Sequence, residues 1–146
     1  MLRRKVTDRL LSWKNDSDKA LLVTGARQIG KSYAIRAFGK DNYASYFEAN
    51  LLLDAEARDV LIGAKNAVDF INRVALLADA PLVEGDTLIF VDEIQEYPQI
   101  VTLMKALVED GRFSYVFSGS MLGTEFKGIS SFPVGYVEHI VMRPMD

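Results

Sequence analysis

The chain has 146 residues, of which 49% are apolar and 25% are charged, and it carries a formal net charge of −3. This length and composition are typical of one globular domain with a single core, and they exclude a disordered chain. The absence of cysteine excludes disulfides and thiolate metal sites, and the single histidine cannot build a metal centre by itself. The negative net charge gives no indication of a surface that binds nucleic acid.

The sequence shows neither a signal peptide nor a membrane span. Charged residues interrupt the first apolar positions before a signal-peptide core reaches useful length. The most apolar helical stretch, residues 74–78, is far shorter than the roughly twenty residues that a span requires. We therefore expect a cytoplasmic protein that has no membrane as partner.

The chain opens with apolar residues at helical spacing, namely Leu2, Val6, Leu10 and Trp13. This pattern predicts an amphipathic helix over residues 2–14 that packs on the core, with Trp13 buried. The apolar run 20–24 then predicts the first buried strand. We expect a single domain over residues 1–146, in which this helix precedes a core at about 19–146.

The segment after this strand fits a phosphate-binding pattern. Residues 25–32 match G-x-x-x-x-G-K-[ST], in which glycines at both ends let backbone N–H groups turn inward as an anion nest. Lys31 would lie across the β- and γ-phosphates of a nucleotide, and the hydroxyl of Ser32 would ligate Mg²⁺. The nucleotide-binding residues that we expect are Gly25, Ala26, Arg27, Gln28, Ile29, Gly30, Lys31, Ser32 and Tyr33.

The alternative for this segment is a glycine-bounded surface turn with an exposed lysine. Arg27 could touch phosphate or a partner, but an exposed loop side chain explains it equally well. A helix-compatible stretch follows at residues 32–38, and Gly39 is the residue that we expect to end it. The position between a strand and a helix favours the phosphate-binding interpretation.

A second motif lies further along the chain. Residues 87–93 form an apolar run that ends in two carboxylates, as expected of a buried parallel strand whose tip opens on a ligand crevice. Asp92 fits as the outer-sphere partner of Mg²⁺, and Glu93 is placed to polarise a water for in-line attack on the γ-phosphate. Strands also end in acidic turn residues for structural reasons. Combined with the phosphate loop, the two acids favour hydrolysis.

Other polar residues near these motifs have two explanations each. Glu48 and Asn50, at the end of a predicted strand over 44–50, could steer Glu93 between active and resting positions or could be turn residues. Gln95 could hydrogen-bond the attacking water or Glu93, or could simply begin a helix.

The remaining segments alternate between helix and strand patterns. Helices are predicted over 55–62, over 67–77 and from Pro98 to Gly111, and strands over 113–118 and 136–141. Alternation of this kind favours parallel strands joined by right-handed crossovers. The sequence therefore predicts an α/β fold, a three-layer α/β/α sandwich of the P-loop NTPase type with a mainly parallel five-stranded sheet.

Together these segments resemble the bacterial and archaeal AAA+ type ATPases whose ATP-binding core precedes a C-terminal domain of uncharacterised function. The resemblance covers nearly the whole chain, and the segments that carry it are residues 25–32, 92–95, 118–120 and 133–135. It implies that ATP is the nucleotide, that Ser118 or Ser120 occupies the sensor position, and that the chain is the N-terminal part of a longer protein. Many members carry an arginine after the glycine before the last strand, but Tyr136 follows Gly135 here. We therefore assign no arginine finger.

The favoured hypothesis is a Walker A and Walker B ATPase core that hydrolyses ATP to drive a conformational change in an attached domain or partner. Its expected catalytic residues are Glu93, Lys31, Ser118 and Ser120, and its expected metal ligands are Ser32 and Asp92. The alternative is a nucleotide-dependent switch with little or no turnover. A homo-oligomer, or a C-terminal domain acting in trans, stays open as partner.

A small-molecule kinase is disfavoured. Such enzymes usually cover the transferred phosphate with an arginine-rich lid, and the region after Gly111 holds only Arg112 and Arg143.

Overall fold

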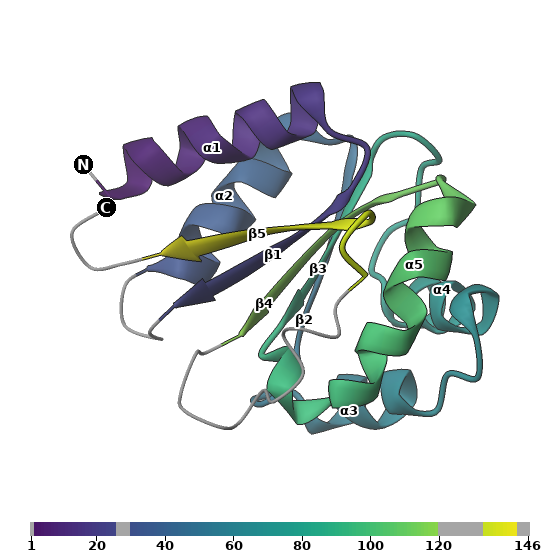
Figure 1. The fold of residues 1–146 in the computed structure, drawn as a ribbon. Coiled ribbons are helices and arrows are strands. Elements are labelled where there is room, and N and C mark those ends of the chain that lie inside the picture. The colour runs from purple at the N-terminus through teal and green to yellow at the C-terminus, as the bar shows by residue number, and fades with distance from the viewer. Residues whose placement is uncertain (1, 26–29, 120–132, 143–146) are drawn as a thin grey trace.

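The computed structural model describes residues 2–25, 30–119 and 133–142, and helices cover both faces of its central sheet (Figure 1). The sheet has five strands in the order β2-β3-β4-β1-β5, and every pairing between them is parallel. The strands are β1 (Ala20–Gly25), β2 (Ser45–Asn50), β3 (Thr87–Asp92), β4 (Ser114–Gly119) and β5 (Val137–Met142). The predicted α/β fold with a five-stranded parallel sheet is confirmed.

Two helices cover one face of the sheet and three cover the other (Figure 1). The first pair is α1 (Leu2–Asp16) and α2 (Lys31–Asn42), and the opposite layer is α3 (Ala55–Ile62), α4 (Ala67–Leu77) and α5 (Val101–Asp110). Because both faces are covered, every residue of β1 and β3 is buried. These strands therefore read as continuous apolar runs rather than alternating ones.

Each face of the sheet has its own apolar core. On the α1 and α2 side, Trp13 and Phe38 pack toward Phe90, and the Trp13 Nε1–H donates to the Lys19 carbonyl at 2.8 Å. On the other side, Phe70 lies in one cluster with Phe117. Trp13 is 5% exposed, so the prediction that it belongs to the core is confirmed.

The helix boundaries lie close to the predicted ones, but α1 continues to Asp16 and α5 begins at Val101 rather than at Pro98. Pro98 lies in the short 3-10 turn η3 (Pro98–Ile100) that leads into α5, and Gly111 ends α5 with a left-handed φ of 75°. The prediction that Gly39 ends α2 is wrong, because the helix continues to Asn42. A Cβ at position 39 would lie 2.4 Å from the Tyr46 ring, so this glycine lets α2 approach β2 closely. None of the helices in the described part of the chain is long and apolar enough to cross a bilayer.

Replacing Gly39 with Ala tests this close approach. In an ordinary helix interior the change would stabilise the protein by about 1 kcal/mol. Here the added methyl group meets Tyr46 and also Leu88, at 3.0 Å, so we expect the free energy of unfolding to fall by roughly 1–3 kcal/mol in urea denaturation. Gly135→Ala, where a Cβ meets open space, is the control and should stay within about 0.5 kcal/mol of the parent. A stabilised Gly39→Ala protein would contradict the packing.

Candidate functional site

The carboxyl ends of three neighbouring strands define one edge of the sheet. The strands β3, β4 and β1 are consecutive in the sheet, and all point the same way. In open parallel sheets, ligands bind in the crevice beyond these ends. The residues singled out by the sequence follow β1, end β3 and end β4, so the fold gathers them at this edge.

Lys31 is the first residue of α2 and is almost completely buried, with 2% of its surface exposed. Its ammonium group donates to the carbonyl of Gly119, at the end of β4, at 3.1 Å and to that of Gly25, at the end of β1, at 3.5 Å. Gly30, just before the helix, has φ 75°, a left-handed conformation that glycine adopts without steric cost. The lysine and the amino end of α2 therefore place positive charge at the strand ends.

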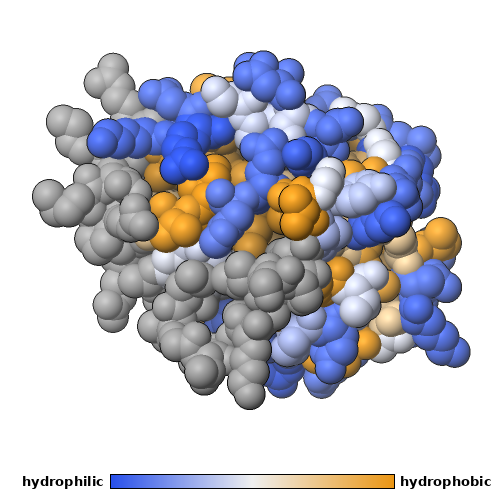
Figure 2. Space-filling view, in the orientation of Figure 1, coloured by the Kyte–Doolittle hydropathy of each residue, from blue (hydrophilic) through white to orange (hydrophobic). Residues whose placement is uncertain are grey.

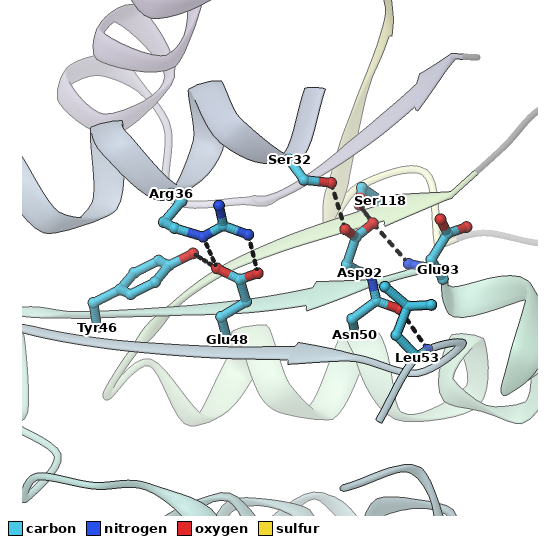
Figure 3. Close-up of polar contacts among 9 residues, drawn as sticks. All are labelled: Ser32, Arg36, Tyr46, Glu48, Asn50, Leu53, Asp92, Glu93 and Ser118. Carbon is cyan, nitrogen blue, oxygen red and sulfur yellow. Dashed lines mark hydrogen bonds and ion pairs between the residues drawn. The ribbon is translucent and has the colours of Figure 1, made fainter. Parts of the chain in front are cut away.

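The Asp92 carboxylate joins three elements (Figure 3). Its Oδ2 accepts a hydrogen bond from the Ser32 hydroxyl of α2 at 2.5 Å. Its Oδ1 accepts from the Ser118 hydroxyl of β4 and from the Glu93 backbone N–H, the latter at 2.8 Å. Asp92 is 1% exposed and Ser118 is fully buried. The structure thus brings together both expected metal ligands and the expected sensor serine.

A hydroxyl beside a carboxylate suits a hard divalent cation. Mg²⁺ prefers oxygen ligands and commonly takes only one or two from the protein, with water and phosphate completing its shell. Ser32 and Asp92 offer such a pair, and within the described ranges no three His, Cys, Asp or Glu residues gather as a metal cluster. The residues present therefore fit Mg²⁺ carried by a nucleotide better than a metal held by protein alone.

Glu93 stands in an unusual backbone conformation. With φ 58° and ψ 50°, it is the one non-glycine residue with positive φ in the described ranges, and it is only 7% exposed. Such a conformation costs of order 1 kcal/mol and is often retained where function requires it. It turns the chain from β3 into the 3-10 turn η2 (Ile94–Glu96), and the Glu93 side chain lies apart from the Asp92 carboxylate (Figure 3).

Glu48 and Asn50 were candidates for steering Glu93, but their side chains contact other residues. Glu48 accepts two hydrogen bonds from the Arg36 guanidinium, at 2.8 and 2.7 Å, and one from the Tyr46 hydroxyl at 2.7 Å (Figure 3). The Asn50 Oδ1 accepts the backbone N–H groups of the turn after β2, at 3.0 Å each. The turn explanation therefore holds for Asn50, and Glu48 fixes α2 to β2.

The electrostatics of this Glu48 contact are those of a half-buried ion pair. Burial raises the pKa of the Glu48 carboxyl, but the hydrogen bonds from Arg36 and Tyr46 outweigh burial and hold that pKa below its ordinary value. Burial and the bond to Glu48 together raise the pKa of the Tyr46 hydroxyl. The pair holds α2 against the sheet one turn beyond Ser32.

Two further residues were considered as candidates. His139 lies beside the site, and Arg112 lies away from it. His139 Nε2 lies 2.7 Å from the Thr24 Oγ1, across the β1–β5 pairing, and burial lowers the pKa of its imidazole. Arg112 precedes β4 and pairs with Asp110 at 3.0 Å, so it stands at the amino end of the strand and away from the site of its own chain.

Several predicted site residues lie outside the described residues. They are Ala26, Arg27, Gln28, Ile29 and Ser120. Tyr33 is described, and its side chain is half exposed on α2.

A groove beside the site was not predicted from the sequence. It lies between α1 and β5, encloses about 280 Å³, and is lined by Lys5, Val6, Arg9, Leu10, Val23, Ile140, Val141 and Met142. Figure 2 shows hydrophobic surface in this region. Met142 pairs with Gly25, so one end of the groove adjoins the start of the phosphate-binding segment. The helical apolar stripe of α1 was visible in the sequence, but its pairing with β5 was not.

A parallel sheet with a buried lysine at the start of the helix that follows β1, and with an acid-tipped β3, is typical of a P-loop NTPase. Residues 17–146 match the family model described as an AAA domain, and the chain belongs to this family as an AAA+ type P-loop ATPase core. None of the curated proteins matches the chain.

A solved structure with the same fold is that of Drosophila ORC bound to AT-rich DNA and Cdc6. The superposition gives a TM-score of 0.58 at 12% identity and covers 98% of this chain and 55% of that chain. The present chain therefore spans little more than half the length of that protein. At this identity the likeness shows the fold alone.

Replacing Glu48 with Gln tests the ion pair. Because the folded-state pKa is depressed, the pair stabilises the protein above the unfolded value of 4.5, and this contribution is lost as pH falls through the folded pKa. We expect the variant to be about 1 kcal/mol less stable at pH 7, after allowing for solvent screening, and the difference to shrink below pH 4.5. Thermal unfolding across pH measures this. Glu84→Gln, in the exposed turn before β3, controls for the loss of one charge; a difference that grows in acid would contradict the assignment.

Proposed function

We propose that the chain binds ATP with Mg²⁺ and hydrolyses it, and that the turnover drives a conformational change in an attached domain or partner. The observation that carries this proposal is the Asp92 carboxylate, shared by the hydroxyls of Ser32 and Ser118 beside the buried Lys31. Membership of the AAA domain family supports nucleotide binding. The order of an ATPase core followed by a further domain is part of the same proposal.

Phosphate binding is assigned to the segment after β1 and to the start of α2. Residues 25–33 would surround the phosphates, with the Lys31 ammonium exchanging its carbonyl partners for phosphate oxygens. Ser32 and Asp92 would hold Mg²⁺, which when bound neutralises phosphate charge. Ser118 keeps the Asp92 carboxylate oriented, and Ser120 is proposed as a second sensor residue.

Glu93 is assigned the activation of water. Its carboxylate would accept a proton as the water oxygen attacks the γ-phosphorus, while the bond from that phosphorus to the bridging oxygen breaks and ADP leaves. A buried position at the carboxyl end of β3, separate from the Asp92 carboxylate, suits a base that lies near the metal without ligating it.

The groove between α1 and β5 is proposed to take the nucleoside. Its walls are apolar apart from Lys5 and Arg9 and suit a flat base, and it adjoins Gly25, where the phosphate-binding segment begins. This assignment supplies the base contacts for which no motif is visible in the sequence.

Lys31→Ala tests the phosphate site. We expect the affinity for ATP with Mg²⁺ to fall at least about tenfold, because a charge-assisted contact to phosphate is lost. Isothermal calorimetry measures the dissociation constant. Lys40→Ala, an exposed lysine on the same helix, is the matched control and should leave affinity within about twofold of the parent. Equal losses in both variants would argue against the site.

Glu93→Gln separates hydrolysis from binding. The change removes the base while keeping the size of the side chain, so turnover should fall about 100-fold or more and ATP affinity should persist. Phosphate release, followed beside calorimetry, gives both quantities. A parent chain that binds ATP without turnover would favour the alternative, a nucleotide-dependent switch.

A further inference from the structure

Gln95 occupies the space between Glu93 and the end of β4. It lies in the turn η2, directly after the buried Ile94, and its side chain returns toward the strand ends. Its Nε2 donates to the Glu93 Oε1 at 2.6 Å. Its Oε1 is buried and has no hydrogen-bond partner within the described part of the chain.

The other end of the Gln95 amide lies against Gly119. A Cβ built on Gly119 would come within 2.8 Å of the Gln95 Oε1, so this position has no room for a side chain while Gln95 is in place. The Gly119 carbonyl in turn accepts the Lys31 ammonium at 3.1 Å. The amide therefore spans the distance from the Glu93 carboxylate to the strand end that binds the lysine.

This arrangement fixes which way the amide faces. If its oxygen faced Glu93, two acceptors would meet, so the N–H side must face the carboxylate. The oxygen is then a buried acceptor without a partner among the described residues, which is an energetically unfavourable state.

We propose that Gln95 is a positioning residue that holds the Glu93 carboxylate in its working orientation, with Gly119 as the surface against which the amide is seated. This inference rests on the hydrolytic function proposed above. Carboxylates that act as bases depend on neighbouring groups for orientation, and loss of such support typically costs one to two orders of magnitude in rate. Glu93 gains this support from a residue on its own turn.

The main test is Gln95→Met, which keeps the length and volume of the side chain but donates no hydrogen bond. We expect kcat to fall about tenfold or more while the dissociation constant for ATP stays within about twofold of the parent. The matched control is Gln99→Met, an exposed glutamine in η3, which should leave kcat unchanged. Unchanged kcat in Gln95→Met, or a loss confined to ATP affinity, would overturn the proposal.

A second comparison shows whether Gln95 acts through Glu93. In a Glu93→Gln background, the further change Gln95→Met should leave the residual turnover unaltered, because the group that it positions is gone. A further drop of the same size as in the parent background would show an independent role and sink the inference.

Gly119→Ala tests the same contact from the β4 side. It replaces the main test if thermal unfolding shows that Gln95→Met does not fold. The added methyl group should displace the amide and lower kcat, and in a Gln95→Ala background, where space is available, it should have no further effect. A parent chain that binds but does not hydrolyse ATP would refute the proposed function and this inference with it. An active parent whose turnover survives both Gln95→Met and Gly119→Ala would refute the inference alone.

Discussion

The site depends on one buried carboxylate. Asp92 ends β3, yet it accepts hydrogen bonds from a serine of α2 and from a serine of β4, which are far apart in the chain. A buried carboxylate is stable only when its oxygens are satisfied, so these hydroxyls are structural partners as well as site residues. Removing any of the three would leave a buried polar group unsatisfied and would also loosen the geometry at the strand ends. Stability and function are therefore coupled here through the same atoms.

Much of this arrangement was predictable because its signals are local. Two short patterns carry most of the information. One is the glycine–lysine–serine segment after the first apolar run, and the other is the acid pair that ends the apolar run over residues 87–91. The residue types in both have known chemical roles. In a parallel sheet, carboxyl ends share one edge, so the fold class predicted Lys31 and Asp92 at the same edge, whereas the strand order that separates β1 from β3 by β4 alone was not predicted. The side-chain partners could not be deduced in the same way. For Gln95 the sequence left open a bond to the attacking water, a bond to Glu93 and a plain helix start, and only the position of η2 against β4 shows that its amide contacts Glu93.

Gly39 and the α1–β5 groove show where local reasoning fails. A glycine late in a helix pattern fits a C-cap, but the same residue also permits close packing, and only the distant Tyr46 decides between the two. The groove combines a helix from the start of the chain with a strand from its last part. Neither half carries a motif, because an apolar lining has no distinctive pattern beyond the stripe that any packed helix shows.

The order of the sheet has a consequence for how the protein is made. Leu21 of β1 pairs with Val116 of β4 and with Glu138 of β5, so β1 finds both neighbours only when nearly all of the described chain is present. Until then β1 has two unpaired edges and a continuous apolar surface, features that favour association with other chains. Pairing of such high contact order is slow to form. The exposed edges of β1 during translation therefore define the period in which this protein is most prone to aggregate.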